Sequence, residues 1–348
     1  MGSRLQSLVY GAWLALILGW VLYIGQAVWI PLVLGVVVVY IIVGVTHLLG
    51  RAPLIGAWLP LQLRYVLSML LIGCAVIALG TLAIANKDRV VALVPQYQEA
   101  LLFAIQKLAA WLRVETEPTW ATLRQDMLSR INLQFLLGSV LVSVSAIAVS
   151  VTIVLLYTVF LLVEQHGFST KLARLSDDPA QVARVAAVIG DINRRIGAYL
   201  AYKTLLSALL AAISWAIMAA YGLEFAGFWA LLIGFLNFIP YLGSVLGVLF
   251  PAIMAVVQFS DAATLLSLLA ALTVAQFLIG NFLDPWVMGN SLNLSPLAIL
   301  VALGVWSELW GVPGAFLAVP ITAILVIVLS EFPGSRPIAV LLSRNGQL

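Results

Sequence analysis

The stretch Asn237–Gly243, which reads Asn-Phe-Ile-Pro-Tyr-Leu-Gly, interrupts an apolar run that extends from about Phe228 to Phe259. Such a run is longer than the roughly 25 residues that one untilted membrane helix needs. Proline removes a helical hydrogen bond, and in hydrocarbon each freed backbone group costs several kcal/mol unless protein or trapped water satisfies it. Broken backbone is therefore typical of membrane segments that line a cavity. The stretch predicts a broken segment at a transport site.

Two more interruptions follow the first. Asn281–Gly289 contains Asp-Pro, and Trp310–Gly314 divides the last long apolar run, Pro296–Leu329. One consistent arrangement makes each of the two long runs a bent or re-entrant pair of short helices that enter from opposite sides, as in the inverted repeats of secondary transporters. The residues expected to form the helix breaks or hinges are Pro240, Gly243, Pro285, Gly289, Gly311, Pro313 and Gly314.

Composition places the whole chain in a membrane. Of its 348 residues, 64% are hydrophobic and 9% are charged, whereas soluble domains are about half apolar and about a quarter charged. This excludes a soluble globular enzyme. The net charge of +3 is small and the basic residues are spread over loops, which indicates membrane orientation rather than nucleic-acid binding. We predict an all-α integral membrane protein that contacts the lipid bilayer and no nucleic acid.

The hydropathy pattern divides the chain into six parts. Long loops weigh little in the positive-inside rule. The basic residues outside the long mixed-charge segment 86–136 therefore place both termini in the cytoplasm. The expected parts are spans one to three (1–85), a non-cytoplasmic segment of amphipathic interfacial helices (86–136), span four (137–164), a cytoplasmic amphipathic helix (165–202), a transport core with broken helices (203–332) and a cytoplasmic tail (333–348).

Neutral and acidic polar residues near the breaks are the candidate binding groups. A small, polar, uncharged solute needs a few convergent hydrogen-bonding side chains in a dry cavity. The expected substrate-binding amides are Asn237, Gln276, Asn281 and Asn290. The alternative is that an asparagine beside a proline caps a loose helix end. Glu308 and Asp284 are candidates for ion or proton coupling, because a carboxylate within a membrane is costly. The alternative for Glu308 is a position near a helix break that water reaches. The alternative for Asp284 is that it caps a helix N-terminus.

Enzymatic and metal chemistry find little support in the sequence. Cys74 is the single cysteine, and His47 and His166 are far apart with no ligand spacing around them. No serine-hydrolase elbow, zinc-protease motif or pair of aspartates in facing spans is present. We predict no catalytic residues, no metal and no cofactor.

A family resemblance rests on the broken segments. Phe235–Gly247 resembles the signature of the autoinducer-2 exporter family of bacterial membrane proteins, and so do the runs that follow it. Tyr199–Thr204 and Ile338–Ser343 match the quorum-signal exporter branch of that family. The resemblance covers the whole chain in layout and is specific from about Ala180 onward. The further matching runs are Gly280–Gly289, Leu292–Pro296 and Trp310–Pro320.

The resemblance implies an inner-membrane protein of eight helices that forms homo-oligomers, with a pentamer expected. It also implies export of the quorum-sensing signal autoinducer-2 by an elevator-like motion. One departure is Glu308, since the exporter branch carries small and aromatic residues at that place. The alternatives are a sodium/proton antiporter and an exporter of another small metabolite. A non-transporting scaffold leaves the broken helices without an explanation.

Overall fold

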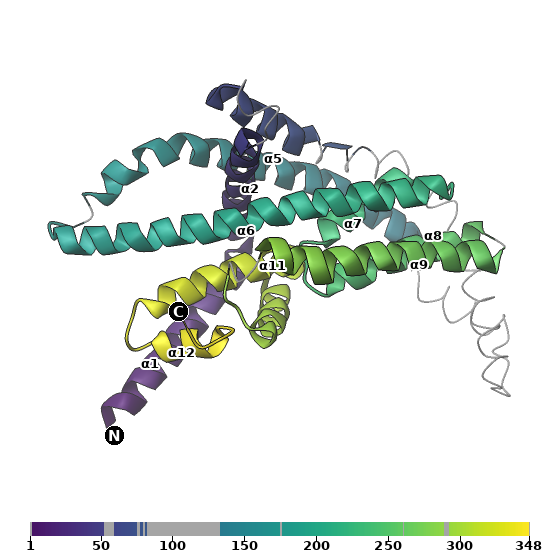
Figure 1. The fold of residues 1–348 in the computed structure, drawn as a ribbon. Coiled ribbons are helices and arrows are strands. Elements are labelled where there is room, and N and C mark those ends of the chain that lie inside the picture. Colours follow the sequence, from purple (N-terminus) through teal and green to yellow (C-terminus); the bar gives the residue numbers. More distant parts are fainter. Residues whose placement is uncertain are drawn as a thin grey trace. The chain divides into compact units, whose positions relative to one another are not determined.

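The computed structural model describes residues 2–51, 59–74, 77–78, 81, 133–174, 176–259, 261–288 and 292–347. Within these ranges the regular elements are helices (Figure 1). One isolated bridge pairs Leu294 with Ser343. The predicted segment 86–136 lies outside them except for its last four residues. The named elements are α1 (Gly2–Ile24), α2 (Gln26–Arg51), α5 (Leu133–Leu172), α6 (Pro179–Ala220), α7 (Ala226–Leu236), α8 (Leu242–Gln258), α9 (Ala262–Leu278), the π-helix η1 (Ile279–Leu283), α10 (Asp284–Met288), α11 (Pro296–Ser330) and α12 (Arg336–Leu342).

Several of these helices have the length and composition of membrane spans. Four are long and apolar enough to cross a bilayer: Gln26–Gly50, Pro179–Ala220, Ala262–Val287 and Pro296–Ser330. Shorter apolar helices include α7, the first part of α8 and Leu61–Cys74. Large apolar side chains such as Trp13 and Trp20 are exposed, as lipid-facing residues are. The predicted all-α membrane class is confirmed, whereas the count of eight spans stays a prediction.

The chain forms two compact units. The first unit contains Met1–Met69, Ser150–Thr204 and Met288–Leu348, and the second contains Leu70–Val149 and Leu205–Val287. Each unit is therefore assembled from segments that are distant in sequence. The predicted interruption at Asn237–Gly243 lies in the second unit, and the one at Trp310–Gly314 lies in the first unit.

Small residues let the helices of the first unit approach closely. A Cβ at Gly44 of α2 would lie 2.5 Å from the Cβ of Ala201 on α6, which leaves no room for a side chain there. Polar contacts add to this packing: Thr46 donates to the Ser68 Oγ at 3.0 Å, with both residues buried. Glycine and hydroxyl contacts of this kind are the usual means of association between membrane helices.

The second unit has an apolar core between the end of α6 and the helices α7, α8 and α9. Its loop from α6 to α7 is closed by Gln258, whose Nε2 donates to the Gly222 carbonyl at 2.7 Å. The Gln258 Oε1 accepts from the Glu224 N–H at 2.8 Å. The core residues are Leu210, Met218, Leu223, Ala230, Ile233, Met254, Ala255, Leu268, Leu272 and Ile279.

Asp261 begins α9, and its hydrogen bonds predict a dependence on pH. Its carboxylate accepts from the Thr264 N–H at 2.9 Å, the Thr264 hydroxyl at 2.8 Å and the Ala263 N–H at 3.3 Å. The backbone hydrogen bond from Thr264 is the main reason that the pKa of Asp261 is lowered. A lowered folded-state pKa contributes stability above the unfolded pKa of about 3.9, and this is lost as pH falls through the folded pKa.

We therefore expect Asp261→Asn to keep a cap but to remove this titration. Melting temperatures of the purified protein should be compared from neutral pH down to about pH 3, a range that spans the carboxyl pKa. The wild type should lose more stability than Asp261→Asn in the acidic part of that range. Parallel curves would contradict the assignment.

Candidate functional site

The first interruption separates α7 from α8. Helix α7 ends at Leu236, a turn covers 237–241, and α8 begins at Leu242. The turn ends on Tyr241, which has a φ of 61°, an uncommon backbone conformation for a residue with a side chain. Pro240 lies within the turn, where its missing N–H interrupts no helix. The sequence predicted a break at this place, and the chain folds as two short helices around it.

Gly243 makes the close packing of this turn possible. A Cβ at Gly243 would lie 2.0 Å from the Leu236 carbonyl oxygen and 3.2 Å from the Cα of Asn237. Both are backbone atoms, which a rotamer change cannot move away. No residue other than glycine fits there without displacing α8 from the end of α7.

Two of the four predicted amides are buried near this turn. The Asn237 Nδ2 donates to the Ser207 Oγ of α6 at 3.0 Å, with both side chains buried. Gln276 of α9 is 8% exposed, and its Oε1 lies 3.8 Å from the position of a Cβ at Gly247 in α8. Gly247 also faces Ile233, one turn before Asn237. Both amides thus belong to the packed helices of the second unit.

The Gln276 amide makes no hydrogen bond to any described residue. The residue is 8% exposed, but its amide nitrogen and oxygen are not among the fully enclosed side-chain atoms that lack a hydrogen bond in the described part of the chain. The Gln276 amide is therefore available to a ligand or to water.

A third predicted amide, Asn281, is placed differently. It is exposed, and its Nδ2 donates to the Phe277 carbonyl four residues earlier at 3.2 Å. The structure therefore does not bring Asn281 into the cluster around the first turn. The fourth predicted amide, Asn290, and the predicted hinge Gly289 lie outside the described residues.

The second predicted interruption is a π-helical turn rather than a break. The backbone remains helical from α9 through η1 and α10 to Met288. Pro285 lacks an N–H, and its ring would clash with the carbonyl of Asn281 in a regular α-helix. The chain widens by one residue instead, so that the Asp284 N–H donates to the Ile279 carbonyl five residues back. The helix is thus widened rather than ended before Pro285, and the role of Pro285 as a hinge stays a prediction. π-Helical turns are often found at functional sites.

The third interruption lies inside α11. Gly311 has a φ of 63° and a ψ of −139°, a region that residues with a Cβ avoid. A Cβ at Gly314 would lie 1.8 Å from the Trp306 carbonyl oxygen. Pro313 lies between the two glycines. The helix is therefore kinked at this place, and glycine is required on both sides of the proline.

Two tryptophans hold the kink of α11 in place. The Trp306 Nε1 donates to the Thr322 Oγ1 at 3.1 Å, across the kink. The Trp310 Nε1 donates to the Leu22 carbonyl of α1 at 3.0 Å. The two ring centroids are 5.4 Å apart. The Trp306 indole thus joins the two halves of α11, and the Trp310 indole connects the helix to α1.

The candidate coupling carboxylates differ in exposure. Glu308 lies between these tryptophans in sequence and is exposed, whereas Asp284 is half-buried at the start of α10. Among the residues that the structure describes, no three histidine, cysteine, aspartate or glutamate side chains gather as metal ligands.

Residues 11–334 match the model of a family described as AI-2E family transporter. The chain belongs to the AI-2E transporter family. Similar proteins include the AI-2 transport protein TqsA of Escherichia coli (strain K12), which is 34% identical over 209 residues. That alignment covers 60% of this chain and 59% of TqsA. The predicted family is confirmed.

Other relatives match over different lengths. A protein of Borreliella burgdorferi (strain ATCC 35210 / DSM 4680 / CIP 102532 / B31) is 34% identical over 194 residues, 56% of this chain and 53% of its own. YhhT of Escherichia coli (strain K12) is 26% identical over 291 residues, 82% of this chain and 80% of its own. The chain thus spans little more than half the length of the two relatives that are 34% identical.

Three residues of this AI-2E transporter were not among the predicted site residues. Ser207 of α6 accepts the hydrogen bond from Asn237. Trp229 of α7 has a buried Nε1 with no hydrogen-bond partner among the described residues, and tryptophan in an apolar run usually indicates an interface. Lys203 of α6 is buried as well. A serine among small residues and a tryptophan in an apolar run gave no sequence signal for these positions.

Proposed function

We propose that this transporter exports a small, polar, uncharged solute, with autoinducer-2 as the expected substrate. Membership of the AI-2E family supports membrane transport, and the family is one of transporters rather than enzymes. TqsA is named an AI-2 transport protein, which supports autoinducer-2 as the substrate. The family also contains relatives whose names state no substrate, so the choice depends on the chemistry of the site.

The observation that carries the proposal is the amide of the buried residue Gln276, which makes no hydrogen bond to any residue that the structure describes. An amide offers two N–H donors and a carbonyl acceptor but no charge. It therefore recognises hydroxyl and carbonyl groups of a neutral solute. The Asn237 amide has further hydrogen-bonding capacity after its bond to Ser207. Together these amides suit a solute rich in hydroxyl groups, such as a furanone-like sugar derivative.

The proposed mechanism is elevator-like alternating access in the bacterial inner membrane. Residues 203–332 move as the transport core against a homo-oligomeric frame, expected to be a pentamer, which the spans of 1–85 and 137–164 form. Segments 165–202 and 333–348 are on the cytoplasmic side with both termini, and 86–136 is on the other side. The breaks at Pro240 and Gly311 support this proposal, because irregular backbone at membrane depth is typical of transport sites.

A sodium/proton antiporter is the second candidate. Glu308 favours it, because this exposed carboxylate lies on an otherwise apolar helix, and acidic residues in membrane segments often bind protons or cations. Asp284 is the other carboxylate that such a mechanism would use. In that case the amides around the first turn would have only structural roles.

Uptake into energised, everted membrane vesicles distinguishes the two candidates. Wild type and Glu308→Gln are compared with labelled autoinducer-2 and with a pH-sensitive dye after sodium is added. We expect both proteins to accumulate the signal, with no sodium-dependent change in pH. A sodium-driven pH change that disappears in Glu308→Gln, without accumulation of the signal, would make the chain an antiporter.

A further inference from the structure

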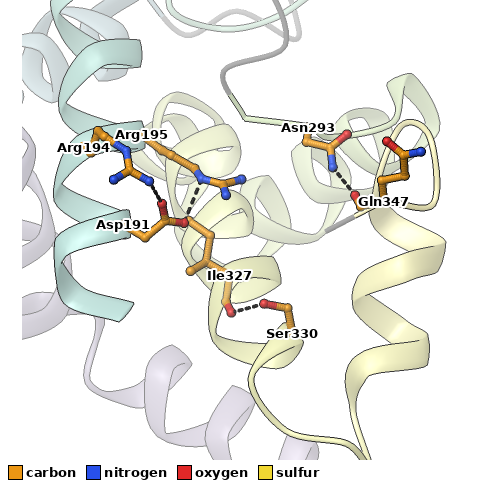
Figure 2. A network of polar contacts seen from close by, with 7 residues as sticks. All are labelled: Asp191, Arg194, Arg195, Asn293, Ile327, Ser330 and Gln347. Atoms are coloured by element: carbon orange, nitrogen blue, oxygen red, sulfur yellow. Dashed lines mark hydrogen bonds and ion pairs between the residues drawn. The ribbon is translucent and has the colours of Figure 1, made fainter. Parts of the chain in front are cut away.

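A charged pocket of about 480 Å³ lies in the first unit, well apart in sequence from the amides discussed above. The first half of α6, the end of α11 and the start of α12 form it, and Figure 2 shows its central polar contacts. Its volume is within the range of about 300–1,000 Å³ that is usual for small-ligand sites. Its charged lining consists of Arg184, Asp191, Arg195, Glu331 and Arg336.

The charges of this pocket favour an anion. Three arginines face two carboxylates, which leaves one net positive charge. One of the carboxylates is already neutralised: Asp191 forms an ion pair with the Arg195 Nε at 2.8 Å and accepts a hydrogen bond from Arg194 (Figure 2). The ion pair through Nε orients the Arg195 guanidinium and leaves its two terminal nitrogens as donors. Asp191 therefore acts as a support for Arg195 rather than as a competitor for the ligand.

The other two arginines are free to bind. Arg184 and Arg336 are exposed, and neither side chain forms an ion pair with any residue that the structure describes. Arginine donors match the oxygens of a phosphate group, often through two parallel hydrogen bonds. The pocket thus presents guanidinium groups from two different helices toward one volume.

The residues around the pocket indicate whether a bound phosphate group would belong to a lipid or to a soluble compound. The pocket lies at the end of the long apolar helix α11, where a membrane helix leaves the hydrocarbon. Beside it, Phe332, Ile338 and Leu341 are 60%, 51% and 80% exposed. A basic pocket next to exposed apolar side chains suits an anionic lipid, whose headgroup and acyl chains need both. A soluble phosphate compound would use only the charged part.

We propose that this pocket binds the phosphate group of an anionic phospholipid. Arg184, Arg195 and Arg336 donate hydrogen bonds to the phosphate oxygens, and the apolar side chains on and before α12 contact the acyl chains. The lipid would tie α6 to α11 and α12 within the first unit. This proposal does not depend on which solute is transported.

Lipid binding by the purified full-length protein tests the proposal. Binding of phosphatidylglycerol is titrated by native mass spectrometry for wild type, Arg184→Gln and Arg336→Gln. Arg174→Gln is the matched control, since it removes the same charge from an exposed arginine outside the pocket. We expect each pocket variant to bind about tenfold more weakly, as for loss of one charge-assisted hydrogen bond. The control should change by less than about threefold.

A second titration separates a lipid from a free anion. Inorganic phosphate and glycerol 3-phosphate are added to the same four proteins, and their melting temperatures are followed. Stabilisation of the wild type by soluble phosphate, without a preference for phosphatidylglycerol over phosphatidylcholine, would overturn the lipid assignment. Equal weakening of phosphatidylglycerol binding in all three variants, or no weakening in any, would overturn the site itself.

Discussion

Replacing Gly243 by alanine should abolish transport and destabilise the protein. The new Cβ would lie 2.0 Å from the Leu236 carbonyl oxygen, well inside any tolerated contact. Because the opposing atom is backbone, α8 must move away from the end of α7, and the buried amides nearby lose their positions. We expect a loss of about 3 kcal/mol, the upper end for overpacking. Thermal melting of the purified protein and export from vesicles measure the two effects.

Gly280→Ala is the matched control for this substitution. It lies in the same unit, and a Cβ there would meet nothing within 4 Å. Alanine is favoured over glycine in a helix by about 1 kcal/mol, so the control should be as stable as the wild type or slightly more stable. If Gly243→Ala melted and transported like Gly280→Ala, the tight turn would not exist in the protein.

The sequence could predict the membrane fold because the relevant signals are local. A long apolar run with Pro240 and Gly243 at its middle favours broken helices, and the turn at 237–241 lies at these residues. Gly311 shows the same logic, since the kink in α11 requires its positive φ. Pro285 shows the limit: a proline can end a helix or widen it, and only the hydrogen bond between Asp284 and Ile279 decides which.

The candidate site could be predicted only in part, because burial depends on contacts between helices. Gln276 and Asn281 look alike in the sequence, as amides near the predicted breaks. They differ because Gln276 faces α8 whereas Asn281 faces outward and bonds its own helix. Ser207 and Trp229 carried no local signal, since a serine among small residues and a tryptophan in an apolar run have common structural roles. The division of the chain into two units likewise depends on long-range packing.

Gln276→Met should abolish transport without destabilising the protein. Methionine keeps the length and flexibility of glutamine but has no amide. In the wild type this amide makes no hydrogen bond to any residue that the structure describes, so its removal breaks no such contact within the protein. We therefore expect an unchanged or higher melting temperature, together with at least a tenfold loss of export, as for a lost hydrogen bond to substrate. Melting of the purified protein and initial export rates in vesicles provide the two readings.

Gln258→Met provides the opposite control within the same unit. Both polar atoms of the Gln258 amide bond backbone groups, namely the Gly222 carbonyl and the Glu224 N–H. Their loss removes two hydrogen bonds to exposed backbone groups, so stability should fall by about 1 kcal/mol while the protein that remains folded still exports. Gln276→Met should thus lose export but keep its melting temperature, whereas Gln258→Met should keep export but melt at a lower temperature. A lower melting temperature with normal export in Gln276→Met would show that this amide is structural and that the substrate binds elsewhere.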